Sequence, residues 1–369
     1  MLRIDLITIL SSLLLSSIGF FAQPWCMDQV PEVEQTEPEK MKFDPGPVQE
    51  YSFSDGVNAL VAAKQDWREK RKCVSCHTNG WGLAAQPVIA PNSEEVSVGR
   101  EFAQDYLKKY LDGKVKPSGQ HGSTEGMIAT TAFLVMSDAR SGEKMHKVTR
   151  QALGHAWERL DESGTWEDWL QCNWPPFESD AEFGPTLMLV ALGELNEVSR
   201  LKKSDQRNAL KLCAYLKINP PLSLHAKAMR LWAARYWPDL LRDENEASHW
   251  RVELLNAQDA DGGWSMATLA GPAWKRDGGE EQTKTSEAYP TAFATYVLLQ
   301  VRVVPPSGKA SGDSREAINK GLLWLKKNQR KGGEWSTRSP RRDRQHYIGR
   351  AATSFALMAL VEGDEDKLK

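Results

Sequence analysis

Two cysteines and a histidine stand at the spacing C-x-x-C-H, as Cys73, Cys76 and His77. Two thiols at this spacing can add across the two vinyl groups of a haem, and the histidine that follows can then bind its iron. The motif therefore predicts a covalently attached haem c, with His77 as the proximal iron ligand.

A dithiol or local disulfide and a zinc site are the alternatives for this motif. A four-ligand zinc site needs a second Cys or His pair with ligand spacing, and the sequence shows none. The other cysteines, Cys26, Cys172 and Cys213, are scattered. Haem is therefore the prediction that the spacing favours.

Residues 1–22 have the pattern of a secretory signal, because Arg3 precedes an apolar run that ends in small residues. Residues 23–50 are acidic and proline-rich, and they predict a tether without a core. We therefore expect an exported protein, periplasmic or otherwise extracytoplasmic, that contacts a membrane only if the signal stays uncleaved. The net charge of −2 argues against a nucleic acid partner.

The remainder of the chain, residues 51–363, predicts an all-α domain followed by a charged tail at 364–369. Apolar residues recur with a period near 3.6, and no alternating strand pattern is present. Breaks at Gly, Pro and Asn give twelve expected helices, at 53–70, 82–90, 95–112, 123–139, 143–161, 184–199, 203–217, 221–236, 239–258, 287–303, 313–328 and 348–362.

An internal repeat organises these helices into pairs. The sequence Q-x3-G-x-W occurs at residues 258–264 and again at 329–335, and each copy precedes a helix rich in small residues. A degenerate third copy ends at Trp166. The pattern predicts a helical hairpin in which an outer helix ends in a glycine turn locked by tryptophan, and six such hairpins of about 50 residues fill the domain.

The two complete copies resemble the QW repeats of squalene/hopene cyclases and the repeats of protein prenyltransferase β subunits. This resemblance implies an α/α toroid of six hairpins. The C-x-x-C-H motif also resembles that of a family of exported bacterial proteins on this fold. The similar stretches are residues 123–126, 172–180 and 348–353.

In a toroid of this kind, the C-x-x-C-H motif replaces the glycine turn of hairpin one, at the mouth of the barrel. His121 and His346 precede the inner helices of the two neighbouring hairpins, so they are the candidates for the distal iron ligand. His225 lies across the ring, and Met127 or an open position are further alternatives.

Acidic residues and tryptophans near the ends of hairpins are candidates for lining a pocket at the mouth. The acidic residues also suit helix N-termini, where they stabilise the helix without further function. The cyclase motif D-x-D-D and the zinc ligands of the prenyltransferases are not matched. The candidate pocket residues are Trp81, Glu125, Trp166, Glu182, Trp264, Glu287 and Trp335.

A basic loop precedes the last inner helix. Guanidinium groups pair well with carboxylates, so Arg338, Arg342 and Arg350 are candidates for binding haem propionates or an acidic redox partner. A solvated loop is the alternative.

Together these features predict an exported c-type haem protein that acts in electron transfer or in haem-based binding and sensing. One alternative is an enzyme, either a terpenoid-type cyclase or a haem oxidoreductase, acting on an apolar small molecule in the barrel. Another is a haem-free scaffold that binds a lipid or a peptide.

Overall fold

The computed structural model of the protein describes residues 43–114, 119–166, 169, 174–243, 245–301, 310–343 and 345–363. The side chains of residues 119–123, 198 and 310–313 are outside this description. The expected signal, most of the tether, and the charged tail also lie outside the described residues. Within the described part, every helix is too short or too polar to span a membrane.

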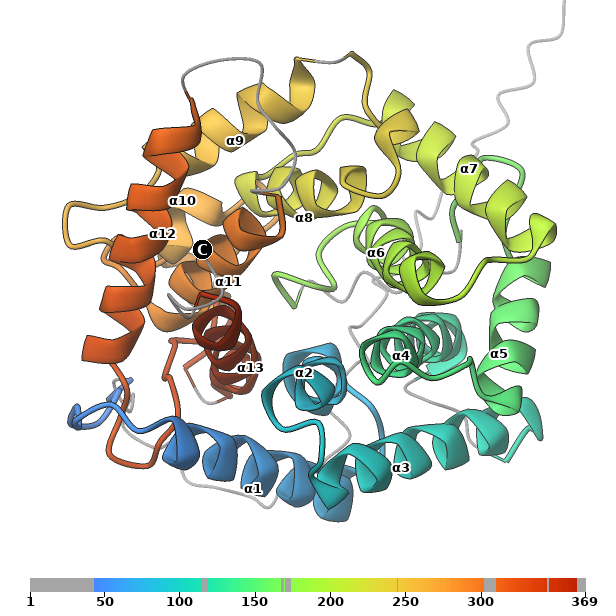
Figure 1. Ribbon diagram of the computed structural model, residues 1–369, viewed down its shortest axis with the longest axis horizontal. Coiled ribbons are helices and arrows are strands. Elements are labelled where there is room, and N and C mark those ends of the chain that lie inside the picture. The colour runs from blue at the N-terminus through green and yellow to red at the C-terminus, as the bar shows by residue number, and fades with distance from the viewer. Residues whose placement is uncertain are drawn as a thin grey trace, which may run out of the picture.

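In the part of the chain that the structure describes, six helices form an outer ring around six inner helices (Figure 1). The outer helices are α1 (Phe53–Arg71), α3 (Glu94–Leu111), α5 (Lys147–Glu158), α7 (Lys203–Ile218), α9 (Glu246–Asn256) and α12 (Ala310–Lys327). The inner helices are α2 (Trp81–Ile89), α4 (Gly119–Arg140), α6 (Phe183–Val198), α8 (Leu224–Ala234), α11 (Ala288–Val301) and α13 (Ile348–Glu362). Each inner helix packs against the next, and α13 packs against α2, so the ring is closed. The predicted six-hairpin α/α toroid is confirmed.

The repeat makes the corner between an outer and an inner helix. Gly164, Gly262 and Gly333 have φ values of 89°, 91° and 88°, which favour glycine. The tryptophan two residues later donates its indole N–H to a carbonyl near the end of the outer helix. The three bonds, Trp166 to Ala156, Trp264 to Leu254 and Trp335 to Leu325, are each 2.9 Å long.

The glutamine of the repeat fixes the same turn from the other side. Gln258 donates to the Gly262 carbonyl at 2.9 Å, and Gln329 donates to the Gly333 carbonyl at 2.8 Å. Each residue of Q-x3-G-x-W therefore has a structural role at the corner, which explains why the pattern predicts the fold without specifying an activity.

The last residues of the expected tether pack on the toroid. Val48 forms an isolated β-bridge with Arg330, and the Gln49 amide donates to the Gln329 carbonyl at 2.9 Å. Because α1 follows directly, this segment joins the first hairpin to the last.

The axis of the barrel is filled with aromatic side chains. Trp81 is fully buried, and its ring centroid lies 4.5 Å from Phe355, 5.1 Å from Phe133 and 6.1 Å from Trp232. These rings come from four inner helices, so the core is continuous across the ring.

Candidate metal centre

The C-x-x-C-H motif lies at the corner between α1 and α2, and its second half forms a π-helical turn (Cys76–Gly80). The Asn79 side chain fixes this turn, because it accepts from the Ser75 amide at 2.9 Å and donates to the Cys73 carbonyl at 3.0 Å. Cys76 and His77 are thereby buried, at 2% and 0% exposure.

Neither cysteine of the motif is in a disulfide. Cys73 is half-buried, and burial raises the pKa of its thiol to about 11, so the group is protonated at neutral pH. The local disulfide considered for this motif is not formed in this structure.

The His77 ring has one satisfied nitrogen and one without a partner. Nε2 lies 3.3 Å from the Pro175 carbonyl, and because a carbonyl only accepts, the proton is on Nε2. Nδ1 is then an unprotonated acceptor, buried without a hydrogen-bond partner. Burial lowers the pKa of His77 to about 4, although the Pro175 and Trp174 carbonyls oppose this shift, so the imidazole is neutral.

Two carboxylates meet the motif from neighbouring hairpins. Cys76, Glu125 on α4 and Glu178 before α6 each place one donor atom so that all three atoms lie within 4.8 Å of one another. Glu125 and Glu178 are only 6% and 5% exposed. Oε1 of Glu178 is also 3.9 Å from Nδ1 of His77. Three buried donor groups from three consecutive hairpins therefore lie close together, and His77 approaches this cluster at Glu178.

The segment from Trp174 to Glu178 covers this point. Trp174 and Glu178 form an isolated β-bridge, and the loop before α6 reaches toward the centre of the ring (Figure 1). The Phe177 ring lies 5.0 Å from His77, and the Trp174 ring lies 6.1 Å from it. A haem bound to Nε2 of His77 would have to displace Pro175 and Phe177.

The candidate distal ligands make other contacts. His121 is in the first turn of α4, and its side chain is outside the described residues. Nδ1 of His346 accepts from the Ser339 amide at 2.9 Å, and its ring lies 4.6 Å from Phe43. His225 bonds the Tyr289 hydroxyl at 2.8 Å, and burial lowers its pKa to about 3.

The candidate pocket residues do not converge on one cavity. Trp166, Trp264 and Trp335 lock separate corners, as described above. Glu182 forms a buried ion pair with Arg230 at 2.7 Å. Trp81 and Glu125 alone lie close to the motif: Trp81 follows it directly and contacts Phe177 at 6.0 Å.

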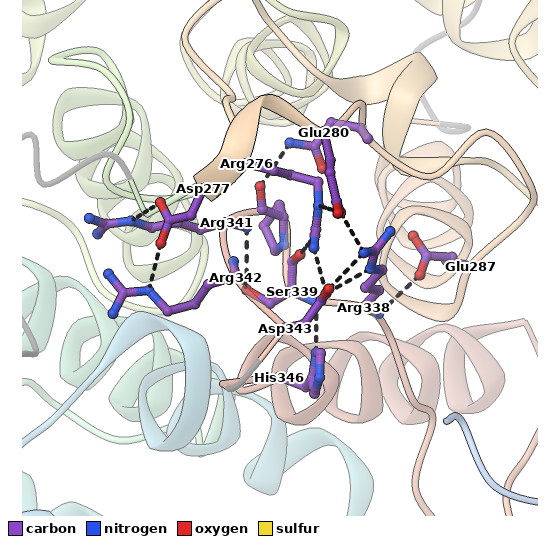
Figure 2. Close-up of polar contacts among 12 residues, drawn as sticks. Arg276, Asp277, Glu280, Glu287, Arg338, Ser339, Arg341, Arg342, Asp343 and His346 are labelled. Carbon is purple, nitrogen blue, oxygen red and sulfur yellow. Dashed lines mark hydrogen bonds and ion pairs between the residues drawn. The ribbon is translucent and has the colours of Figure 1, made fainter. Parts of the chain in front are cut away.

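The basic loop is neutralised by acidic residues of the same chain (Figure 2). Arg338 binds Asp343 and Glu280, at 2.7 Å and 2.8 Å. Arg342 pairs with Asp277 at 3.1 Å. The guanidinium groups of Arg341 and Arg342 each lie 4.9 Å from the Trp174 ring, whereas Arg350 pairs with Asp66 at 3.0 Å on the outer side.

Glu178 is not among the site residues that the sequence predicts. It follows two prolines and a phenylalanine in the loop before the third inner helix, within the stretch 172–180 that carries the family resemblance. The Glu178 carboxylate becomes a candidate ligand only in the folded chain, where it lies close to Cys76.

No family model matches this sequence, and no curated protein is similar enough in sequence to count as a relative. Similar solved structures include the unsaturated glucuronyl hydrolase of Bacillus sp. GL1, with 13% identity and a TM-score of 0.51, over 85% of this chain and 97% of that one. The type II terpene cyclase MstE from Scytonema has 14% identity and a TM-score of 0.50, over 84% and 98%. The unsaturated glucuronyl hydrolase of Streptococcus agalactiae has 10% identity and a TM-score of 0.51, over 88% and 99%. At these identities the likeness is one of fold, and it establishes the chain as an α/α toroid.

Proposed function

We propose that the chain is an exported metalloprotein whose transition-metal ion is held at the mouth of the toroid by Cys76, His77, Glu125 and Glu178. The observation that carries this proposal is the cluster of three buried donor groups, Cys76, Glu125 and Glu178, within 4.8 Å of one another. Nδ1 of His77 lies 3.9 Å from Oε1 of Glu178 and is buried without a hydrogen-bond partner, so a cation bound beside it would satisfy it.

The hydrogen bond of His77 supports the same role. A histidine that binds a metal usually donates its other ring N–H to a backbone carbonyl or carboxylate, which fixes the tautomer and the ring orientation. Nε2 of His77 does so with Pro175, and it leaves Nδ1 directed at the carboxylate.

The donor set indicates the class of ion. A thiolate and an imidazole select zinc, iron or copper over magnesium and calcium, and carboxylates are common ligands of iron and zinc. Ligand atoms of a tetrahedral zinc site lie roughly 3.3–3.8 Å apart, so the donors of Cys76, Glu125 and Glu178, now within 4.8 Å of one another, must approach by about 1 Å on binding. Nδ1 of His77 must also move toward them. Four protein ligands satisfy such an ion. This arrangement suits electron transfer by iron, with a redox protein as partner, better than catalysis at an open position.

Haem c is the second candidate, and the C-x-x-C-H spacing favours it. It uses both Cys73 and Cys76, and it requires residues 174–178 to leave the Nε2 side of His77. The terpenoid cyclase alternative is disfavoured because Trp81, Phe133, Trp232 and Phe355 fill the axis where an apolar substrate would lie.

Purification from a host that is competent in cytochrome c maturation tests the proposal. We expect about one equivalent of iron or zinc by elemental analysis, and no pyridine haemochrome band after denaturation. A chain that carries covalent haem, or a chain that stays metal-free after incubation with Fe²⁺ and Zn²⁺, contradicts the four-ligand centre.

A further inference from the structure

The loop before α13 contacts the segment that covers the metal centre. The guanidinium carbons of Arg341 and Arg342 each lie 4.9 Å from the centroid of the Trp174 ring, which is 1% exposed. A guanidinium group over an indole ring is attracted by the negative face of the ring, and the attraction is stronger where water is excluded. Hairpin six is thereby joined to the loop before the inner helix of hairpin three.

Asp277 holds the two arginines together. Two cations beside the same ring repel each other, and the Asp277 carboxylate pairs with both, at 3.6 Å from Arg341 and 3.1 Å from Arg342 (Figure 2). The Asp277 amide also donates to the Arg341 carbonyl at 2.7 Å. The contact with Trp174 therefore depends on the loop before α11 as well as on the loop before α13.

These two loops are joined to each other. Arg276 donates to the Ser339 carbonyl, and it pairs with Asp343. The Arg338 amide donates to Glu287, directly before α11, at 2.9 Å. The contacts make one unit of the two loops, the clamp, which consists of residues 276–280 and 338–343.

Trp174 lies next to the groups that orient two of the proposed metal ligands. The Pro175 carbonyl lies 3.3 Å from Nε2 of His77 and fixes its tautomer. The Glu178 amide donates to the Trp174 carbonyl at 3.3 Å, and the two residues form a β-bridge. A shift of Trp174 would therefore move both the hydrogen-bond partner of His77 and the backbone of Glu178.

We propose that Arg341 and Arg342 are positioning residues for the metal centre, and that they act through Trp174. The clamp holds the covering segment closed, so that His77 and Glu178 are in place before an ion arrives. Ligands that are already ordered bind more tightly, because less conformational freedom is lost on binding. The effect on affinity rests on the proposed metal-binding function, whereas the position of the covering segment does not.

Alkylation of Cys76 in the metal-free full chain tests the position of the segment without any metal. Iodoacetamide modifies accessible thiols, and peptide mass spectrometry measures the rate at each cysteine. In the double variant Arg341→Gln with Arg342→Gln, Cys76 should react at least about tenfold faster than in wild type. Cys213, equally buried on α7, should keep its wild-type rate. An unchanged rate at Cys76, or an equal increase at both cysteines, overturns the proposal.

Arg235→Gln is the matched control. Arg235 also lies over an aromatic ring, that of Tyr236 at 5.1 Å, and it pairs with Glu197 at 3.4 Å. It caps the C-terminal end of α8, whereas the inner helices begin at the mouth. This variant should leave the alkylation rate of Cys76 within about twofold of wild type. An increase as large as that of the double variant would contradict a specific role of the clamp.

Cobalt binding tests the effect on the ligands, because the visible absorption of Co²⁺ reports its coordination geometry. Trp174→Phe keeps an aromatic ring for the guanidinium groups, and Trp174→Leu removes it. We expect the leucine variant to bind Co²⁺ about tenfold or more weakly and with shifted bands, and the phenylalanine variant to keep the wild-type spectrum. Equal behaviour of the two variants contradicts the role of Trp174. Failure of wild type to bind Co²⁺ would refute the metal centre itself, and the alkylation rates would still decide whether the clamp holds the segment.

Discussion

Nδ1 of His77 and Oε1 of Glu178 lie 3.9 Å apart in the buried mouth of the toroid, and the histidine proton is on the opposite nitrogen. Neither a hydrogen bond nor solvent satisfies Nδ1. The buried Nδ1 is therefore the atom that the metal ion proposed above would satisfy.

Removing one carboxylate ligand should weaken metal binding. Glu178→Gln keeps the size of the side chain but loses its charge, so we expect affinity for Co²⁺ or Zn²⁺ to fall at least about 100-fold. Competition titration with a chromophoric chelator measures this. Glu253→Gln, in the Glu253–Lys227 surface pair, is the control and should bind as wild type does. Equal affinity in the two variants would exclude Glu178 as a ligand.

The buried His225 should make stability depend on pH. Its pKa in the folded protein is about 3, below the ordinary 6.5, so the unfolded chain binds the extra proton. Unfolding free energy should therefore fall as pH falls below 6.5, by about 1.4 kcal/mol per pH unit from this group. Urea denaturation of wild type and His225→Gln at pH 6.5 and 4.5 isolates its contribution. Wild type should lose about 2 kcal/mol more than the variant, and parallel losses would contradict this account.

Arg140 should be essential for stability at the far end of the barrel. It pairs with Glu194 at 2.7 Å and bonds the Tyr296 hydroxyl at 3.0 Å, while both charged groups are buried. Arg140→Met leaves Glu194 buried and unpaired, which should lower the free energy of unfolding by about 3–5 kcal/mol.

Two further variants check this reading of Arg140. The double change Arg140→Met with Glu194→Leu should recover most of the loss in denaturant titration, because it removes both partners of the buried pair. Lys227→Met breaks the surface pair with Glu253 and should lower the free energy of unfolding by less than about 1 kcal/mol. If Arg140→Met costs no more than Lys227→Met, the buried network does not stabilise the ring.

The glycine of the repeat should tolerate no side chain. A Cβ on Gly333 would lie 2.3 Å from the Asp55 carbonyl oxygen, and the backbone φ of 88° is unfavourable for alanine as well. Gly113→Ala carries the φ penalty alone, because nothing lies within 4 Å of its Cβ. We expect Gly113→Ala to lower the free energy of unfolding by about 1 kcal/mol, and Gly333→Ala to lower it by about 2 kcal/mol more than that. Thermal or urea denaturation measures both. Similar costs would show that the corner can open to accept a side chain.

Sequence alone was sufficient for the fold because its signals are local. The glycine, glutamine and tryptophan of one repeat bond one another within a single corner, and helical periodicity is read within each helix. Predicted and observed helices differ mainly at their ends, while short elements such as the π-helical turn after Cys76 were missed.

The candidate site depends on distant contacts, so sequence predicted less of it. Cys76 and His77 were identified by their spacing, and Glu125 by its place near an inner helix. Glu178 meets them only because the loop before α6 brings it to Cys76 on hairpin one. The tautomer of His77, set by the Pro175 carbonyl 98 residues away, has no signature in the sequence.

Comparing Cys73→Ser with Cys76→Ser tests the central claim most directly. The four-ligand centre uses Cys76 but not Cys73, whereas attached haem uses both thiols. Metal content and the pyridine haemochrome band are measured on both variants and on wild type. We predict that Cys73→Ser keeps about one equivalent of non-haem metal, that Cys76→Ser loses it, and that none shows haem. Covalent haem in wild type that is impaired in both variants would contradict the four-ligand metal centre.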